Sequence, residues 1–481
     1  MSVIGFVKII SAIIAIVATT FIFPVITALH YGELQMISSF VIPMVCAWII
    51  FLCVYLFTKR EKIKFSIKSS FSVVAVAWLA CSIYGAIPFI LSGCFASVTD
   101  AMFESVSGFS TTGATIFSDV EALPHCINLW RCETHWLGGM GIVALTVALL
   151  PLLGIGGFQL IKAETTGPDK GKVTSKITNT AKALWLIYLS MTVILFILLK
   201  IAGMNVFDSV CHAFSAMGSG GFSTKNTSVA AFNSASIEWI LTVFMFLTGV
   251  NYSLIFYLIT GKVKEIRDNS EFKAYLVIVA VVISLVSVLI YSSIGNSSTA
   301  IRTSAFQVCS IISTTGFSTV DYTMWVPAAQ FLIFILFFIG GCSGSTSGGI
   351  KVVRWVVFHK QVKNEVFKML HPHGIYSVRL NKKVGRKDVV FNVAAFMMCY
   401  AVLVVLVAFA GTFCGLEVFD SFSGALSMVG NFGPGFGALG PSNNFGFLPS
   451  CLKWIYMFAM LAGRLEIYTM VMFLIPEFWK K

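Results

Sequence analysis

Four short loops of glycine and small or hydroxylated residues are the parts of this sequence whose residue types could act on a solute. Each follows a short apolar segment, and the four segments align without gaps. The aligned starts are Asp100, Asp208, Thr303 and Asp420, and position 13 from each start is a glycine: Gly113, Gly221, Gly316 and Gly433. The full set of candidate loop residues is Thr111, Thr112, Gly113, Gly220, Gly221, Thr314, Thr315, Gly316, Asn431, Phe432 and Gly433.

The chemistry expected of such loops is coordination of a bare cation. Glycine tolerates backbone angles that turn carbonyls inward. Four loops around one axis would then offer rings of carbonyl oxygens that replace a hydration shell. The predicted ligands are the backbone carbonyls of Thr112, Gly220, Thr315 and Phe432. An anion pore would favour basic rings, and these loops contain no Lys or Arg.

The short segments before the loops are expected to be helices that begin at their Asp or Thr, since both residues cap helix N-termini well. Such a helix, entering from outside, directs the negative end of its dipole toward the membrane centre. Glycine within an apolar span otherwise marks close helix packing. One shared offset behind four such helices favours the pore interpretation over packing alone.

The elements that must position these loops are membrane spans. Of 481 residues, 57% are hydrophobic and only 11% are charged, whereas a soluble domain is about a quarter charged. Ten apolar segments are long enough to cross a bilayer; they lie near 5–29, 36–58, 71–94, 127–153, 182–203, 236–260, 273–294, 327–357, 389–414 and 452–476. The first is too long for the apolar core of a signal peptide, so we expect it to be retained.

The expected fold is therefore an all-α polytopic membrane protein of four repeats. Each repeat is a span, a short pore helix, a loop and a second span, and two extra N-terminal spans precede the first repeat. The short helices are expected near 100–111, 207–218, 303–313 and 419–430. The expected divisions are 1–68 (two extra helices), 69–165, 180–267, 270–358 (with an interrupted second helix), 359–387 (cytoplasmic segment) and 388–481.

Positive charge predicts the orientation of these spans. With the N-terminus inside, most Lys and Arg residues fall in cytoplasmic loops, as is usual for membrane proteins. The exceptions are Arg131, Lys200, Lys225, Arg302 and Lys453 on the outer side, and Arg464 within a span. Both termini are then cytoplasmic, and the net charge of +12 requires no nucleic-acid partner. The outer side is instead expected to be acidic. This negative charge would either concentrate cations or be only the complement of the positive cytoplasmic side.

The eighth span is interrupted by ten residues, Gly340–Gly349, that are rich in glycine and hydroxyl groups and poor helix formers. Non-helical backbone at membrane depth must line a cavity or be buried in protein. This segment is either a gate below the loops or a static kink. The predicted gate residues are Gly344, Ser345, Thr346, Ser347, Gly348 and Arg464.

Arg464 and Glu466 both lie within the last span, where ionisable residues are costly. Residues two positions apart do not share a helix face, so each needs its own partner. Arg464 is expected either to hold the gate segment or to bond loop carbonyls away from the ion path.

At these residues the chain resembles the Trk/Ktr/HKT superfamily of K⁺ transporters, and within it the TrkH type. The motifs that carry the resemblance are Thr111–Thr115, Gly220–Thr224, Thr314–Thr319, Gly430–Gly435, Gly340–Lys351 and Ala462–Ile467. In this superfamily a serine in place of the first-repeat glycine accompanies Na⁺ transport, so Gly113 favours K⁺. Asn431 and Phe432 depart most from the other loops.

The resemblance implies K⁺ transport across a bacterial cytoplasmic membrane, with K⁺ as the transported ion and no organic cofactor on this chain. It also implies that the four repeats form a pseudo-fourfold pore within one chain, that two such chains form a homodimer, and that cytosolic TrkA-like regulatory subunits bind nucleotide. The basic segment His359–Lys387 is either solvated charge or a docking surface for such subunits, and both are compatible with contacts to the lipid bilayer.

Two alternatives remain. A cation symporter that couples K⁺ to Na⁺ or H⁺ would also use broken helices, but usually shows inverted halves. An intramembrane enzyme would need a catalytic dyad or a metal cluster, and His135 and Glu104 are isolated polar residues. Most of the 12 cysteines lie in apolar runs; Cys126 and Cys132, assigned to one outer loop, could pair.

Overall fold

The computed structural model describes residues 3–59, 67–139, 141, 177–374, 376–381, 383–384 and 387–479. The second half of the predicted span 127–153 lies outside this part of the chain. So do several of the basic residues assigned to the cytoplasmic side: Arg60, Lys62, Lys64, Lys162, Lys170, Lys172, Lys176, Lys382 and Arg386.

The described chain folds into helices, with one small two-stranded hairpin. The N-terminal helices are α1 (Val3–Thr20), α2 (Ile22–Tyr31) and α3 (Leu34–Phe57). Then come α4 (Ile67–Leu91), α5 (Val98–Phe109), α6 (His125–Gly139), α9 (Ile177–Ile201), α10 (Val206–Gly218), α11 (Ala235–Thr248), α12 (Tyr252–Ile259), α13 (Val263–Arg267), α14 (Ser270–Ile294), α15 (Ser297–Ile312), α16 (Pro327–Leu336) and α17 (Val352–Leu370). The chain continues through β1 (Arg379–Leu380), β2 (Lys383–Val384), α18 (Lys387–Phe413), α19 (Val418–Gly430), α20 (Ser450–Arg464), α21 (Ile467–Leu474) and α22 (Pro476–Trp479).

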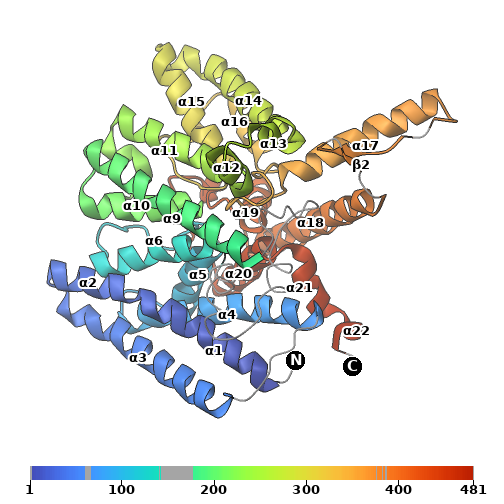
Figure 1. The fold of residues 1–481 in the computed structure, drawn as a ribbon. Helices are drawn as coiled ribbons and strands as arrows, with labels where there is room; N and C mark the ends of the chain where they lie inside the picture. Colours follow the sequence, from blue (N-terminus) through green and yellow to red (C-terminus); the bar gives the residue numbers. More distant parts are fainter. Residues whose placement is uncertain are drawn as a thin grey trace.

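The four repeats surround a common centre, as Figure 1 shows in the progression from cyan through green and yellow to red. The pore helices are α5, α10, α15 and α19, and the first spans are α4, α9, α14 and α18. Among the residues that the structure describes, six helices are long and apolar enough to cross a membrane, or up to eight if two bent pairs each count as one span. The prediction of an all-α polytopic protein with four repeats and two extra N-terminal spans is confirmed.

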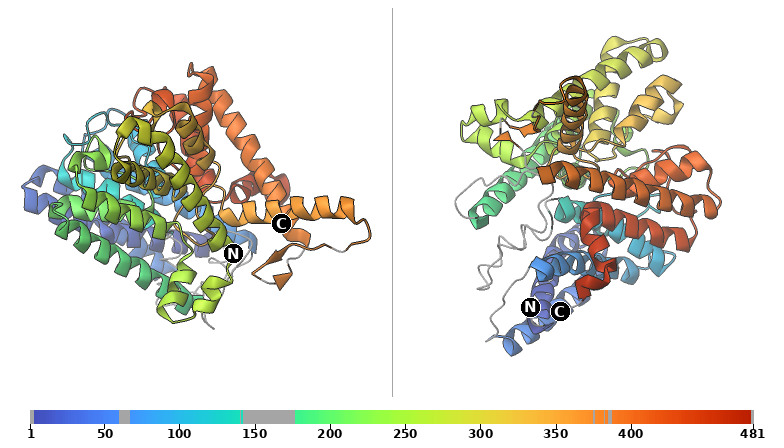
Figure 2. Two further views of the ribbon diagram at one scale, coloured as in Figure 1. Left: turned by 90° about the horizontal axis from the view of Figure 1, so that it is seen from above. Right: turned by 90° about the vertical axis from the view of Figure 1, so that its right-hand side faces the viewer.

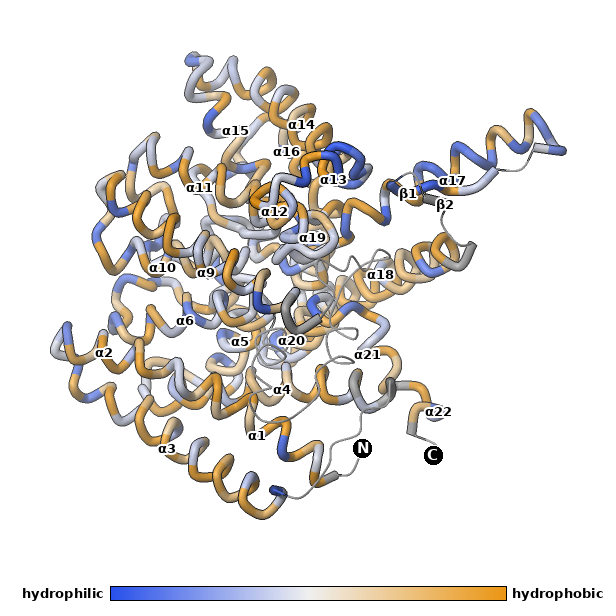
Figure 3. Tube along the Cα trace, viewed as in Figure 1, coloured by the Kyte–Doolittle hydropathy of each residue, from blue (hydrophilic) through white to orange (hydrophobic). Residues whose placement is uncertain are grey.

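Hydrophobic residues predominate along most helices, and hydrophilic residues gather along α13 and α17 (Figure 3). Helix α17 projects away from the body of the molecule in both directions of view (Figures 1 and 2). Its last turns therefore lie outside the bundle that holds the loops. The hairpin β1–β2 pairs antiparallel, with Leu380 opposite Lys383.

The second helices of the second and fourth repeats are bent at a break, whereas the sequence predicted an interruption only in the third repeat. Helices α11 and α12 meet at an angle of 101°, and α20 and α21 at 117°. Helix α6 ends at Gly139, and α16 and α17 are separated by the interrupted segment. The predicted spans at 236–260 and 452–476 therefore each contain a bend that the sequence did not indicate, because hydropathy alone does not distinguish a straight apolar helix from two apolar halves.

A repeated signal for these breaks is present in the sequence. A glycine that follows a glycine, threonine or alanine lies close to the end of a helix in each repeat: Gly139, Gly249, Gly341 and Gly463. Glycine lowers helix stability by about 1 kcal/mol relative to alanine. At these four positions the helix ends or breaks within about a turn, so the repeat extends to the second helices.

The aligned starts of the pore helices are not their N-caps, contrary to the prediction. Ser97, Asn205 and Asn296 are the capping residues of α5, α10 and α15, and each accepts from a first-turn amide. Asp100, Asp208 and Asp420 lie in the third helical position, and Thr303 lies well inside α15. Acidic residues in the first turn still suit the positive end of the helix dipole.

Cys126 and Cys132 do not pair. Both are buried free thiols within α6 rather than in an outer loop. They stand six residues apart on one helix, a spacing that turns their side chains to different faces.

Candidate functional site

The four pore helices end in the same way. The residue at position 11 has a left-handed backbone in every repeat: Thr111, Ser219, Thr314 and Asn431, with φ between 55° and 57°. The next amide, at position 12, donates to the carbonyl of the serine at position 7 over 2.9–3.0 Å. This is the closing bond of a Schellman cap, and it turns each chain sharply out of its helix. Non-glycine residues in this region cost about 1–3 kcal/mol and gather at functional sites.

The glycine at position 13 is required by both conformation and space. Gly113, Gly221, Gly316 and Gly433 have φ between 79° and 90°, where side chains are strained. A Cβ atom on any of them would also lie closer than 3.0 Å to a carbonyl oxygen of another loop. No residue larger than glycine fits there without moving a neighbouring carbonyl.

These close approaches form a closed ring. Gly113 abuts the carbonyl of Gly220, Gly221 that of Thr315, Gly316 that of Phe432, and Gly433 that of Thr112. Each glycine at position 13 therefore touches the position-12 carbonyl of the next repeat, and the fourth repeat returns to the first. The structure brings all eleven predicted loop residues together around one axis.

The segments that follow the position-13 glycines, here called the outgoing limbs, are hydrogen-bonded to one another in the same cyclic order and form a collar. The Asn226 side chain accepts from Val120, and Ser228 accepts from the Ser318 amide over 3.3 Å. Tyr322 donates to the Gly435 carbonyl over 2.7 Å. The Phe445 amide donates to Thr115 over 2.8 Å and closes the collar.

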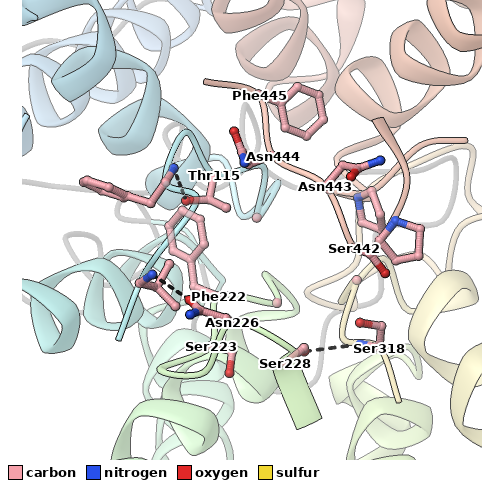
Figure 4. Close-up of a pocket in the computed structure, with 18 of the residues that line it drawn as sticks. Thr115, Phe222, Ser223, Asn226, Ser228, Ser318, Ser442, Asn443, Asn444 and Phe445 are labelled. Atoms are coloured by element: carbon pink, nitrogen blue, oxygen red, sulfur yellow. Dashed lines mark hydrogen bonds between the residues drawn. The ribbon is translucent and has the colours of Figure 1, made fainter. Parts of the chain in front are cut away.

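A cavity of about 110 Å³ lies inside this collar and is lined by all four position-13 glycines. Figure 4 shows residues of all four repeats around it, among them Thr115, Ser223, Ser318 and Asn443. Among the described residues, the charged lining residues are Arg131 and Lys225, and none is Asp or Glu. The acidic residues predicted for the outer side therefore do not line this cavity.

Sequence reasoning missed the side chains that hold the outgoing limbs. Glu104, His212 and Gln307 all occupy position 4 of their repeats. Glu104 accepts from Thr115 and from the Ile116 amide over 2.9 and 3.0 Å. His212 Nε2 lies 2.9 Å from the Ser223 hydroxyl, and Gln307 donates to the Val320 carbonyl over 3.1 Å. The same alignment that found the glycines would have revealed this column.

Glu104 is not isolated, because it forms a buried ion pair with Arg131. The guanidinium Nε lies 2.7 Å from Glu104, and both side chains are at most 1% exposed. Arg131 also donates to Thr115 over 3.1 Å and to the Ser223 carbonyl over 3.5 Å. One buried cation thus joins the outgoing limbs of the first and second loops.

The fourth loop differs because its asparagine stands at the left-handed position, where Asn is tolerated. Asn431 Nδ2 donates to the Thr112 hydroxyl over 2.9 Å and to the Met460 carbonyl over 3.0 Å. Its side chain therefore links the fourth loop to the first. Phe432, at position 12, is fully buried and packs 5.0 Å from the ring of Phe337.

The interrupted segment between α16 and α17 lies directly against these loops. The Gly348 amide donates to the Thr314 hydroxyl over 2.6 Å. Elsewhere the segment contacts the breaks of the second repeat, with Cys342 donating to the Gly249 carbonyl over 2.8 Å. The predicted gate residues Gly344, Ser345, Thr346, Ser347 and Gly348 thus lie at the level where the second helices break.

Glu271, at the start of α14, was not predicted and holds both ends of this segment. Its Oε1 accepts from the Ser343 amide over 2.6 Å and from the Val353 amide over 3.1 Å. The adjacent Ser270 donates its amide to Asn381, in the hairpin, over 3.0 Å. A chain of contacts therefore runs from the hairpin through α14 to the interrupted segment.

Arg464 and Glu466 have different partners, as expected. Arg464 donates to the Thr346 carbonyl over 2.7 Å and to those of Gly138 and Gly139 over 2.6 and 2.8 Å. It thereby joins the interrupted segment to the end of α6. Glu466 forms an ion pair of 2.5 Å with Arg354.

Comparison with known proteins finds close relatives along the whole chain. The family model TrkH, described as a cation transport protein, matches residues 36–481. A Trk system potassium uptake protein TrkH from Halomonas elongata is 36% identical, over 98% of each chain. One from Escherichia coli K12 is 36% identical over 88% of each. The crystal structure of the potassium transporter TrkH from Vibrio parahaemolyticus matches with a TM-score of 0.88, at 32% identity, over 100% of both chains.

Proposed function

Because the chain belongs to the TrkH family of cation transport proteins, we propose that it is the K⁺-translocating subunit of a Trk-type uptake system in a bacterial cytoplasmic membrane. The observation that carries this proposal is the closed ring, in which each position-13 glycine meets the position-12 carbonyl of the next repeat. Curated relatives over nearly the whole chain are Trk system potassium uptake proteins.

Ion selection takes place at the four loops. Backbone carbonyls at position 12 of each repeat replace water around a dehydrated K⁺. These are the carbonyls of Thr112, Gly220, Thr315 and Phe432. Because the loops are braced by different side chains, the ring is only approximately fourfold, and we expect looser selectivity than in a ring of identical loops.

Flux is controlled by the segment Gly344–Gly348 together with Arg464. The segment lies below the loops, and Arg464 holds it to the end of α6 through the Thr346 carbonyl. Release of these bonds would allow the segment to leave the path. Its glycines supply the conformational freedom for that movement.

Regulation comes from cytosolic TrkA-like subunits that bind nucleotide, and the working unit is a homodimer. Support for docking at the cytoplasmic side comes from helix α17, which projects from the body and carries Lys360, Lys363 and Lys368 (Figure 2). Both termini are cytoplasmic in this arrangement, in keeping with the distribution of positive charge.

The test is cation flux in liposomes that contain the purified protein. A K⁺ gradient alone should drive uptake, whereas dependence on a second gradient of Na⁺ or H⁺ would establish the symporter instead. Gly113→Ser should lower the K⁺ to Na⁺ permeability ratio, because the added side chain displaces the Gly220 carbonyl. Overpacking of about 1–3 kcal/mol predicts a change of about 5- to 150-fold.

Gly32→Ser is the matched control for this substitution. Gly32 has a similar φ of 74°, but no other heavy atom would lie within 4 Å of a Cβ atom at this position. It therefore carries the same backbone strain without displacing a carbonyl. An unchanged permeability ratio in Gly113→Ser, measured in a folded protein, would refute the assignment of the loops as a selectivity filter.

A further inference from the structure

Three of the four loops brace position 12 with a side chain of their own. Thr112 shares a hydroxyl contact of 2.7 Å with Ser110, and Thr315 has the same contact with Ser313. Phe432 packs against the Phe337 ring. The second loop has Gly220 at this position, so its proposed ligand carbonyl has no brace from its own side chain.

The ring of His135, on α6 of the preceding repeat, occupies the space that this missing side chain leaves. A Cβ atom on Gly220 would lie closer than 3.0 Å to three ring atoms of His135. The ring is fully buried and stacks on Phe222, with centroids 4.1 Å apart and planes 21° apart. Residues of the second loop therefore contact it on either side of Gly221.

Packing, rather than strong hydrogen bonding, places the ring. Its Nδ1 makes only long contacts, 3.4 Å to both the Phe222 amide and the Ser215 hydroxyl. Its buried Nε2 has no hydrogen-bond partner within the described residues. One helical turn earlier, the Arg131 guanidinium lies 4.4 Å from the centroid of Phe222. Side chains of α6 thus enclose the second loop from behind.

In the third repeat, a residue at the corresponding distance before a glycine also contacts the loop of the next repeat. His135 stands four residues before Gly139, and Phe337 stands four residues before Gly341. Phe337 packs 5.0 Å from Phe432, the position-12 residue of the next repeat. Both residues therefore reach from the second helix of one repeat to position 12 of the following one.

We propose that His135 is a positioning residue for ion selectivity, whose ring fills the space beside Gly220 and fixes the carbonyl of that residue in the ring of ligands. The inference rests on the proposed function of the loops. The brace comes from the volume of the ring. Removal of the ring would leave a cavity in a close-packed interior. The residues around a cavity relax only in part, so the Gly220 carbonyl would lose contacts that hold it in place.

The experiment measures the K⁺ to Na⁺ permeability ratio from reversal potentials in planar bilayers or liposomes. His135→Ala should lower the ratio about tenfold, since the loop gains room to move. Gly220→Ala should also impair selective flux, because the methyl group meets the imidazole. The double variant His135→Ala/Gly220→Ala places a methyl group where the ring was, and should recover at least part of the ratio lost in His135→Ala.

His135→Phe tests the claim without creating a cavity, and remains informative if His135→Ala fails to fold. It keeps a ring but removes both nitrogens, so the ratio should stay within about threefold of the native value. His125→Ala is the control, since His125 is 45% exposed and contacts Glu33 and Tyr31 rather than a loop.

An unchanged ratio in His135→Ala, an additive loss in the double variant, or a loss in His135→Phe as large as in His135→Ala would each overturn the proposal. Gly113→Ser separates this failure from failure of the proposed function. If Gly113→Ser changes the ratio and His135→Ala does not, the filter assignment stands without the brace. If neither changes it, both fall.

Discussion

Glu271 offers the sharpest test of the gate, because one carboxylate oxygen holds both ends of the interrupted segment. Glu271 is only 7% exposed, and its Oε1 accepts from the amides of Ser343 and Val353. Hydrogen bonds to a charged group contribute about 1.5–3 kcal/mol, and neutral ones about 0.5–1.5 kcal/mol. Glu271→Gln keeps the shape and one acceptor oxygen but removes the charge.

The expected loss is about 1 kcal/mol per bond, or about 2 kcal/mol for the pair. If these bonds hold the segment beneath the loops, this change shifts its equilibrium about 30-fold toward release. Basal K⁺ flux into liposomes, without a cytosolic partner, should rise accordingly until the segment is released most of the time. Glu271→Ala leaves two buried amides without this acceptor and should raise flux at least as much.

Glu265→Gln is the matched control, since Glu265 lies nearby in α13 but is exposed. It removes the same charge without touching the segment and should leave basal flux unchanged. The reasoning is refuted if both Glu271 variants fold and conduct like the native protein, or if Glu265→Gln raises flux equally. A lower flux in Glu271→Gln would show that the hydrogen bonds of Glu271 to Ser343 and Val353 favour the conducting arrangement instead.

Three further predictions concern the gate, the buried ion pair and pH. Deletion of residues 344–348 should raise basal flux, and an equal or lower flux in a folded protein would remove the gate assignment. Glu104→Gln should destabilise the detergent-solubilised protein by up to about 3 kcal/mol, because it leaves Arg131 buried without its counter-charge. Glu121→Gln, in an exposed pair with Lys225, should cost less than about 1 kcal/mol, and equal losses would contradict the argument. Burial acts to raise the pKa of Glu33, but hydrogen bonds from Cys126 and His125 outweigh it, and the pKa lies below its usual 4.5. The stability that Glu33 contributes is present above pH 4.5 and is lost as pH falls through the lowered pKa; thermal unfolding of Glu33→Gln should lose that part of the acid dependence, and an unaltered profile would count against it.

The repeated loops were predictable from the sequence because their determinants are local. A glycine at position 13, a small or polar residue before it and a short apolar helix ahead of it can all be read along one chain. The need for glycine follows from a backbone angle and a close approach that no other residue satisfies. Spans were predictable for a similar reason, since their length and hydropathy are set by the bilayer.

Other features could not be predicted, because they depend on how helices bend and on contacts between residues distant in the sequence. The breaks in α11/α12 and α20/α21 were missed because both halves are apolar, and only the bend of about a right angle or more distinguishes them from a straight span. Glu104 appeared isolated because its partner Arg131 is 27 residues away. His135 was read as a stray polar residue, since nothing in its neighbourhood in the sequence indicates Gly220.

By itself the sequence determined the four loops, the number of repeats and the residue type at each turn, because these depend on backbone conformation and on burial in lipid. Only the tertiary structure decided the order in which loops meet, Gly113 with Gly220 through to Gly433 with Thr112. It also decided which side chains contact them from other elements, among them His135 and Arg131. Those contacts join residues of different repeats. The sequence pattern within one repeat does not indicate which residues of another repeat lie next to it in space.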